Sequence, residues 1–236
     1  MRESVDGETL GQLIALLAHD LRNPLSALHS NVGFLESVLE SGDEDVREAL
    51  EDARVSCDGL MYIIDNLELL GRALSESAPV PTMRLGLMPV LEEVVARHQP
   101  LAQSHGVSLE LVSSTASPQV RSNREMLQRA AGNLIRNGIQ HGLAGGTVKV
   151  HVGSEGGDTV VRVEDSGTAI STELVERAFL PEVQMELKNA TGGRYSRGLG
   201  LYAARVAADT MGARVQASPR PGGSGSILEL RLPTAS

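Results

Sequence analysis

The chain has 236 residues, enough for one large domain or two modest ones. Its formal net charge of −9 argues against binding to nucleic acid or directly to an anionic membrane, because both attract basic surfaces. Aromatic residues make up 2% of the chain and Cys57 is its one cysteine, so we expect an aliphatic core without disulfides and a cytoplasmic location, as a whole protein or as the cytosolic part of a longer receptor.

Two apolar stripes at helical spacing run through residues 10–74. Their aliphatic residues recur at steps of three or four, which is typical of helices that pack at shallow angles. The short polar stretch "ESGDED" separates them, so we expect an antiparallel helical hairpin. Pairing with a second copy into a four-helix bundle would cover both stripes. A plain dimerisation coiled coil is the alternative interpretation.

His19 stands out in the first predicted helix, within "LLAHDLRNPLSAL". It lies roughly 200° around the helix from the leucines two positions before and after it, so its imidazole is expected to point away from the seam. Asp20 can accept a hydrogen bond from the imidazole and leave the other ring nitrogen nucleophilic, and Asn23 can orient a water or an acidic partner. Pro24 removes a helical hydrogen bond, which predicts a bend. The alternative is an exposed histidine without a role beside a tolerated proline.

After the Pro-interrupted linker "SESAPVPT" the pattern changes to alternating strands and helices. We expect a mixed sheet with helices on one face, an α+β layer domain. The predicted strands are 83–88, 107–112, 146–153, 158–165, 213–219 and 224–233. The predicted helices are 89–105, 123–142 and 198–212.

Three polar residues lie four apart on the second of these helices: Asn133, Asn137 and His141. They border its apolar stripe, which is where a pocket wall would lie. Amide oxygens suit Mg²⁺, and His141 can contact phosphate oxygens. A solvated helix edge is the alternative, although Gly132 and Gly138 favour a close approach by something else.

Asp165 and Gly167 follow a predicted strand in "VEDSGTAI". A carboxylate at that place can accept a hydrogen bond from an exocyclic amine, although many ordinary turns contain Asp-x-Gly. The aperiodic stretch "EVQMELKNATGGRYS" is predicted to be a loop over a ligand. Its Lys188, together with Arg194 and Arg197, could supply charge to a polyphosphate or be ordinary surface cations.

The stretch "RGLGLYAAR" places four residues at the predicted start of a helix: Gly198, Leu199, Gly200 and Leu201. Free N–H groups and the helix dipole favour a phosphate there. An ordinary loop-to-helix turn is the alternative.

"HDLRNPL" resembles the phospho-acceptor box of sensor histidine kinases. The later boxes of that family follow in the same order: the asparagine box, the Asp-Gly box, a phenylalanine box "ERAFLP" and the glycine box. The resemblance covers residues 10–232 and implies three parts. These are a dimerisation and phosphotransfer hairpin at 1–76, a linker at 77–83 and an ATP-binding domain of the GHKL type at 84–236.

The resemblance implies ATP and Mg²⁺ as cofactors, a homodimer, and a response-regulator receiver domain as partner. His19 would be autophosphorylated and would pass the phosphoryl group to an aspartate of that partner, while Asn23 would support a phosphatase activity. Asn137 would hold the metal, Asp165 would recognise adenine, and Phe179 would anchor the lid.

Three positions depart from the family pattern: Gln140, Ala169 and Ser196. A degenerate nucleotide domain is therefore a second hypothesis, in which the protein acts without ATP as a histidine phosphotransferase or phosphatase scaffold. A non-enzymatic dimeric module that docks partners is the third.

Overall fold

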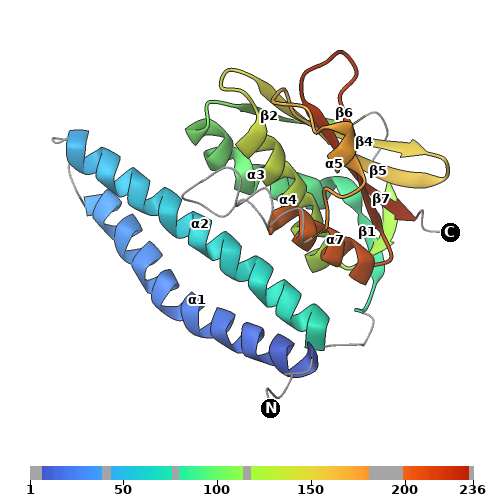
Figure 1. The fold of residues 1–236 in the computed structure, drawn as a ribbon. Coiled ribbons are helices and arrows are strands. Elements are labelled where there is room, and N and C mark those ends of the chain that lie inside the picture. The colour runs from blue at the N-terminus through green and yellow to red at the C-terminus, as the bar shows by residue number, and fades with distance from the viewer. Residues whose placement is uncertain (1–6, 39–43, 76–79, 114–117, 181–198, 234–236) are drawn as a thin grey trace. The chain divides into compact units, whose positions relative to one another are not determined.

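The computed structural model describes residues 7–38, 44–75, 80–113, 118–180 and 199–233 (Figure 1). The chain divides into two compact units, Met1–Ser77 and Ala78–Ser236, each of which is described by itself. Within the described residues, no helix combines the length and apolar character that crossing a membrane requires.

The first unit is a helical hairpin, as predicted. Helix α1 (Gly7–Val38) and helix α2 (Glu44–Ser75) pack along each other. Their shared core consists of Ala18, Leu25, Cys57 and Ile64, with Met61 and Leu67 packed against it. At the open end, a Cβ on Gly11 would lie 2.6 Å from the carbonyl oxygen of Gly71, so the backbones approach too closely there for any larger residue.

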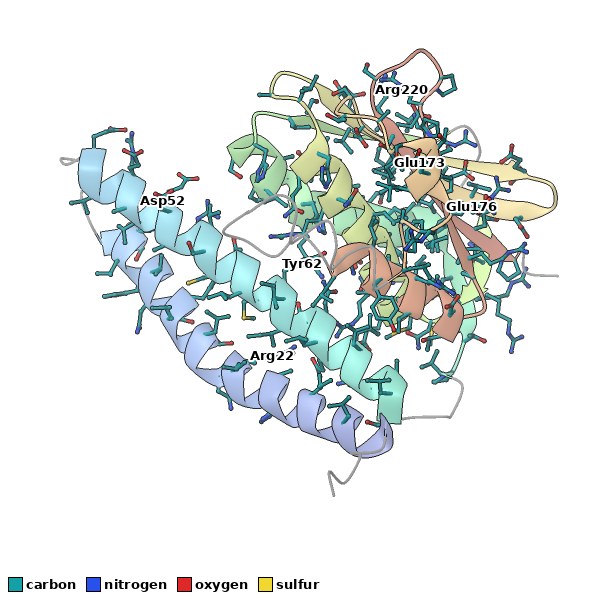
Figure 2. All side chains as sticks on the ribbon, viewed as in Figure 1. Arg22, Asp52, Tyr62, Glu173, Glu176 and Arg220 are labelled. Atoms are coloured by element: carbon teal, nitrogen blue, oxygen red, sulfur yellow. The ribbon has the colours of Figure 1, made fainter. Side chains whose placement is uncertain are left out.

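Polar contacts across the hairpin fix the register of its two helices. The Arg22 guanidinium donates to Asp65 Oδ1 at 2.7 Å and to Glu68 Oε2 at 2.5 Å. Figure 2 labels Arg22 on α1. Nearer the turn, His29 Nε2 lies 3.1 Å from Asp58 Oδ1. All three contacts join α1 to α2 in the antiparallel order.

Each helix of the hairpin also carries a row of large apolar side chains that remain exposed in the single chain. On α1 these side chains recur every seven residues, and Leu21, Leu28 and Leu35 are 52%, 50% and 44% exposed. On α2, Val46, Leu60 and Leu74 belong to the same seven-residue spacing. The hairpin therefore buries only part of its apolar surface by itself.

The second unit contains a five-stranded mixed sheet in the order β2-β4-β5-β7-β6. Strands β2 and β4 are parallel and the other neighbours are antiparallel, so the predicted mixed sheet is confirmed. The strand bounds are β2 Ser108–Ser113, β4 Thr147–Glu155, β5 Asp158–Glu164, β6 Arg214–Pro219 and β7 Ser226–Pro233.

Three helices cover one face of this sheet, again as predicted: α3 (Leu87–Ser104), α4 (Arg124–His141) and α7 (Gly200–Thr210) (Figure 1). Helix α4 is central and contacts both of its neighbours as well as β4, β5 and β7. Its fully buried Leu134 and Ile135 belong to the same core as Val161 and Leu230 of the sheet. Successive side chains of a strand point to opposite faces of the sheet. Along β5 and β7, charged side chains therefore lie on the face that the three helices do not cover.

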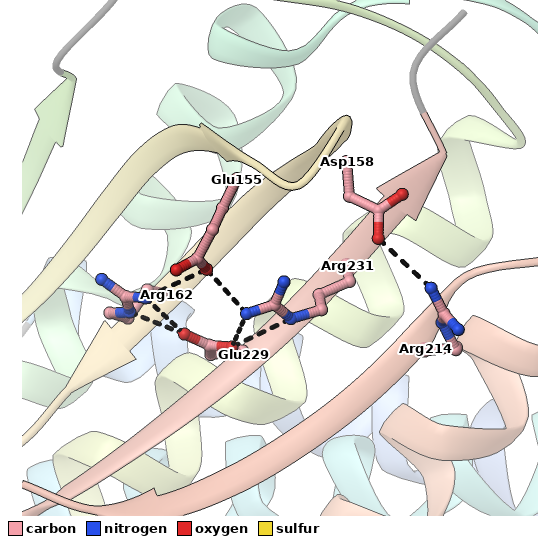
Figure 3. A network of polar contacts seen from close by, with 6 residues as sticks. All are labelled: Glu155, Asp158, Arg162, Arg214, Glu229 and Arg231. Atoms are coloured by element: carbon pink, nitrogen blue, oxygen red, sulfur yellow. Dashed lines mark hydrogen bonds and ion pairs between the residues drawn. The ribbon is translucent and has the colours of Figure 1, made fainter.

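The charged side chains of this opposite face form a network centred on Glu229 (Figure 3). Glu229 Oε1 accepts from Arg162 Nε at 2.7 Å, and Oε2 accepts from Arg231 at 2.8 Å. Arg231 also donates to Glu155 at 2.7 Å. Burial acts to raise the pKa of Glu229, but the hydrogen bonds from the two arginines outweigh it and lower this pKa. The network links β4, β5 and β7.

One strand prediction needs correction, and one strand was missed. The strand predicted at 83–88 is β1 (Met83–Gly86), because the next residues already belong to α3, and Leu87 is fully buried with its N–H donating to the Pro118 carbonyl. Strand β3 (Gln119–Ser122) pairs antiparallel with β1 and was not predicted. Its four residues are too few to show a period in the sequence.

Candidate functional site

His19 is exposed on α1, in agreement with the predicted direction of its side chain. Asn23, one turn further along the helix, is exposed as well. The backbones of Asp20 and Pro24 lie within α1, which continues as one α-helix through the proline. Their side chains lie outside the described residues, so the orienting role of Asp20 and the bend at Pro24 stay predictions.

The three polar residues predicted on α4, which are Asn133, Asn137 and His141, have different surroundings. The N-terminus of α4 is capped by the Asn123 side chain, which accepts from the Met126 N–H at 3.0 Å. Asn133 is 4% exposed, and its amide donates to the Arg129 carbonyl of its own helix at 2.8 Å. Asn137 is half-buried, and within the described part of the chain no hydrogen bond reaches its side chain. His141 is exposed at the last residue of the helix.

Asp165 lies immediately beyond the end of β5, with 2% of its surface exposed. Its Oδ1 accepts a hydrogen bond from the Gly167 N–H at 2.8 Å, which curls the loop around the carboxylate. A Cβ on Gly167 would lie 1.7 Å from the carbonyl oxygen of His141. The Asp-Gly loop therefore contacts the C-terminal end of α4, and the fold brings His141, Asp165 and Gly167 together at one end of the sheet.

The surroundings of Asp165 shift its pKa above the ordinary value. Burial of the carboxyl group is the main cause of this rise. Backbone hydrogen bonds from Gly167 and Ser226 and the positive charges of His141 and Arg220 act in the opposite direction. A buried carboxyl group held by backbone donors at a strand end is a candidate recognition group for a ligand.

The glycine stretch enters the described structure at Leu199, which precedes α7. Gly200 and Leu201 are buried in the first turn of α7, and this helix packs against α4. Lys188, Arg194, Arg197 and Gly198, together with Ser196, lie outside the described residues. Phe179 is 5% exposed, and its expected role as an anchor of the lid stays a prediction.

The described residues contain no cluster of three or more His, Cys, Asp or Glu side chains that could hold a metal ion. Such a cluster is not needed for Mg²⁺ bound with a nucleotide, because this ion keeps several waters and takes most other ligands from phosphates. The half-buried amide of Asn137 could supply one oxygen ligand to such an ion.

Sequence reasoning missed the residues around Asp165 that come from the start of β7 and from the β6–β7 turn. The Asp165 N–H donates to the Ser226 carbonyl at 3.0 Å, and a Cβ on Gly225 would lie 2.0 Å from the Asp165 carbonyl oxygen. Arg220, labelled in Figure 2, adds its charge from the β6–β7 turn. The run "GGSGS" signals an unusual backbone, but only the pairing of β5 with β7 places it beside Asp165.

Both regions match known families. Residues 9–76 match the His Kinase A (phospho-acceptor) domain, and residues 122–236 match the Histidine kinase-, DNA gyrase B-, and HSP90-like ATPase family. A phospho-acceptor hairpin followed by such an ATPase-like domain defines a class of two-part kinase cores. The chain belongs to the histidine kinase family.

Several curated relatives are histidine kinases. The cell-division control histidine kinase PdhS of Brucella suis is 25% identical over 238 residues, which include 94% of this chain. PdhS of Brucella anthropi is 24% identical over 235 residues. The chain spans about a fifth of the length of these relatives, 22% in both cases.

Solved structures of histidine kinases share the fold. Full-length ShkA, in complex with AMPPNP, has a TM-score of 0.69 and 21% sequence identity, and the match covers 95% of this chain and 46% of ShkA. Acinetobacter baumannii AdeS has a TM-score of 0.59 and 20% identity, with 92% of this chain and 98% of AdeS covered. The helical region followed by a sheet domain, as predicted from the sequence, is confirmed.

Proposed function

We propose that this chain is the core of a sensor histidine kinase. It uses ATP to phosphorylate His19 and passes the phosphoryl group to an aspartate of a response-regulator receiver domain. The observation that carries the proposal is the pairing, in one chain, of an exposed His19 on a helical hairpin with an ATPase-family domain that buries Asp165.

The nucleotide would bind at the end of the sheet where α4 meets the Asp-Gly loop. The Asp165 carboxylate would accept a hydrogen bond from the exocyclic amine of adenine, while Gly167 keeps the loop close to α4. The phosphates would lie near the start of α7, where Leu199, Gly200 and Leu201 would offer backbone N–H groups, with Gly198 predicted to extend this set. Asn133, Lys188, Arg197 and His141 complete the proposed binding set.

Asn137 would hold Mg²⁺, which neutralises charge on the phosphate oxygens when bound. In the transfer step a ring nitrogen of His19 forms a bond to the terminal phosphorus as the bond from phosphorus to the ADP oxygen breaks. Asp20 accepts the N–H of the other ring nitrogen and keeps the attacking nitrogen free of its proton. Positioning and charge neutralisation supply most of the rate.

The receiver domain would meet the phosphorylated His19 on the exposed side of α1. There the N–P bond breaks as the receiver carboxylate forms its bond to phosphorus. Asn23 is exposed one turn away and could orient a water that hydrolyses the resulting phosphoaspartate, which yields inorganic phosphate and the free carboxylate. This would be the phosphatase activity of the same surface.

We further propose a homodimer in the cytoplasm, where ATP is available. The support is the pair of exposed apolar rows on α1 and α2, whose seven-residue spacing suits a four-helix bundle of two hairpins. A second copy would remove both rows from water.

Incubation with γ-labelled ATP and Mg²⁺ tests the kinase proposal directly. The wild type should take up label that is lost in acid and retained in base, as expected for a phosphorylated imidazole. His19→Gln should take up none, while His105→Gln, a change at an exposed histidine of the second unit, should label normally. A wild type without label, or a labelled His19→Gln variant, would overturn the proposal.

A further inference from the structure

The loop at residues 165–170 is fastened to one residue of a distant segment, Ser226, the first residue of β7. On the main chain, the Asp165 N–H donates to the Ser226 carbonyl oxygen at 3.0 Å. On the side chain, Ser226 Oγ accepts from the Ile170 N–H at 3.0 Å and donates to the Thr168 carbonyl at 3.4 Å. Ser226 is 4% exposed, so water has little access to replace these bonds.

The side-chain bonds of Ser226 lie on both sides of Ala169. One hydroxyl group therefore fixes the peptide groups that precede and follow this residue. Together with the main-chain bond at Asp165, it holds the loop at its beginning and at its end. Without the hydroxyl, only the beginning of the loop would remain tied to β7.

The residue before Ser226 brings the two segments into contact. Gly225 has a φ of +95°, and a Cβ there would lie 2.0 Å from the Asp165 carbonyl oxygen. This approach places the Ser226 backbone next to the Asp165 side chain, and its N–H is one of the donors that act against the raised pKa of that carboxyl group. The Ser226 residue thus contacts the loop and stabilises its carboxylate.

We propose that Ser226 is a positioning residue that orients the Asp165 carboxylate and so sets the preference for a purine with an exocyclic amine over one with a carbonyl in its place. This inference rests on the proposed function, because it takes Asp165 as the group that recognises the base. Ser226 itself acts only through the loop and need not touch the nucleotide.

The experiment compares ATP with ITP, which carries a carbonyl where ATP carries the amine, by titration calorimetry on the full chain with Mg²⁺. The wild type should favour ATP. Ser226→Ala keeps the main-chain bonds to Asp165 but releases residues 168–170 at the other end of the loop. It should reduce the ratio of the ITP to the ATP dissociation constants about tenfold, because a less firmly oriented Asp165 weakens a hydrogen bond that ATP makes and ITP does not. Ser224→Ala, at an exposed position of the same turn, should keep the wild-type ratio.

A second pair of variants, Ser226→Thr and Ser226→Val, repeats the test with two side chains that are nearly equal in size. Only threonine keeps the hydroxyl group. Threonine should keep most of the ATP preference and valine should lose it, with a binding stoichiometry close to one in both. An unchanged ratio in Ser226→Ala and Ser226→Val, or an equal loss of both nucleotides, would overturn the positioning role. A wild type that binds neither nucleotide would instead overturn the proposed function, and this inference with it.

Discussion

The two units of the chain bury their apolar residues to different degrees. In the sheet unit, the helices α3, α4 and α7 cover one face of the sheet, and side chains such as Leu134, Ile135 and Leu230 are fully buried. In the hairpin, the central core is a narrow line of residues around Leu25 and Ile64, and whole rows of leucines stay exposed. The sheet unit is thus complete in one copy, whereas the hairpin needs another surface to cover it.

The largest effect is expected from a cavity in the sheet unit. Ile135→Ala removes a fully buried side chain from α4 and should lower the free energy of unfolding by about 2–5 kcal/mol. Urea unfolding followed by circular dichroism measures this loss. The matched change Leu21→Ala on the hairpin should cost far less in the isolated chain, because Leu21 is 52% exposed. Equal losses in the two variants would contradict the comparison.

A smaller effect, on association, is expected from the exposed row of α1. Leu28→Ser should raise the dissociation constant of the dimer at least about tenfold, because the lost apolar contact would lie between two copies. Sedimentation equilibrium over a range of concentrations measures it. Leu143→Ser, at an exposed leucine of the sheet unit, provides the control. If both variants dimerise like the wild type, the leucine row has another purpose.

The stability of the sheet unit should also depend on pH through His98 of α3. Burial lowers the pKa of this histidine below 6.5, helped by the charges of Arg136 and Arg97 and opposed by the hydrogen bond to the Val94 carbonyl. The unfolded chain then binds more protons, so stability is retained above pH 6.5 and lost as the pH falls towards the lower folded pKa, by at most about 1.4 kcal/mol per pH unit.

Unfolding of wild type and His98→Gln between pH 7.5 and pH 5.5 measures this contribution. The variant should show a shallower loss of stability on acidification, whereas His105→Gln, at an exposed histidine, should follow the wild type. Parallel curves for wild type and His98→Gln would exclude a role for His98.

The smallest effect is expected at the interhelical ion pair of the hairpin. Arg22 and Asp65 are 34% and 48% exposed at their side chains, so solvent screens their attraction. A double-mutant cycle with Arg22→Met and Asp65→Asn should give a coupling free energy of about 0.5 kcal/mol. A coupling free energy near zero would show that the Arg22–Asp65 pair does not help to set the register of the hairpin.

Most of the architecture could be predicted from the sequence, because the segments with a regular apolar period are long. The two helices of the hairpin and the helices α3, α4 and α7 each repeat their apolar residues over several turns. Strand β3 was missed because its four residues pair only with β1, which is equally short. The start of α3 was misplaced because the alternation at residues 83–86 runs directly into the first helical turn at Leu87.

Residues of the candidate site were predictable only where a short local motif marks them. His141, Asp165 and Gly167 were singled out from local patterns, and the contact between Gly167 and the His141 carbonyl depends on how α4 ends against the loop. Gly225 and Ser226 could not be linked to Asp165 in the same way. Their proximity follows from the β5–β7 register, and spacing along the chain carries no information about that register.

The exposed leucine rows of the hairpin also bear on how such a protein would behave in a cell. In the proposed homodimer, a surface that only a second copy covers would couple the association state of the protein to its abundance. At low copy number, subunits would separate and the rows would meet water, chaperones or proteases. The amount of dimer, and with it the proposed kinase activity, would then rise more steeply than in proportion to the expression level. The protein would therefore be active only above a threshold number of molecules per cell.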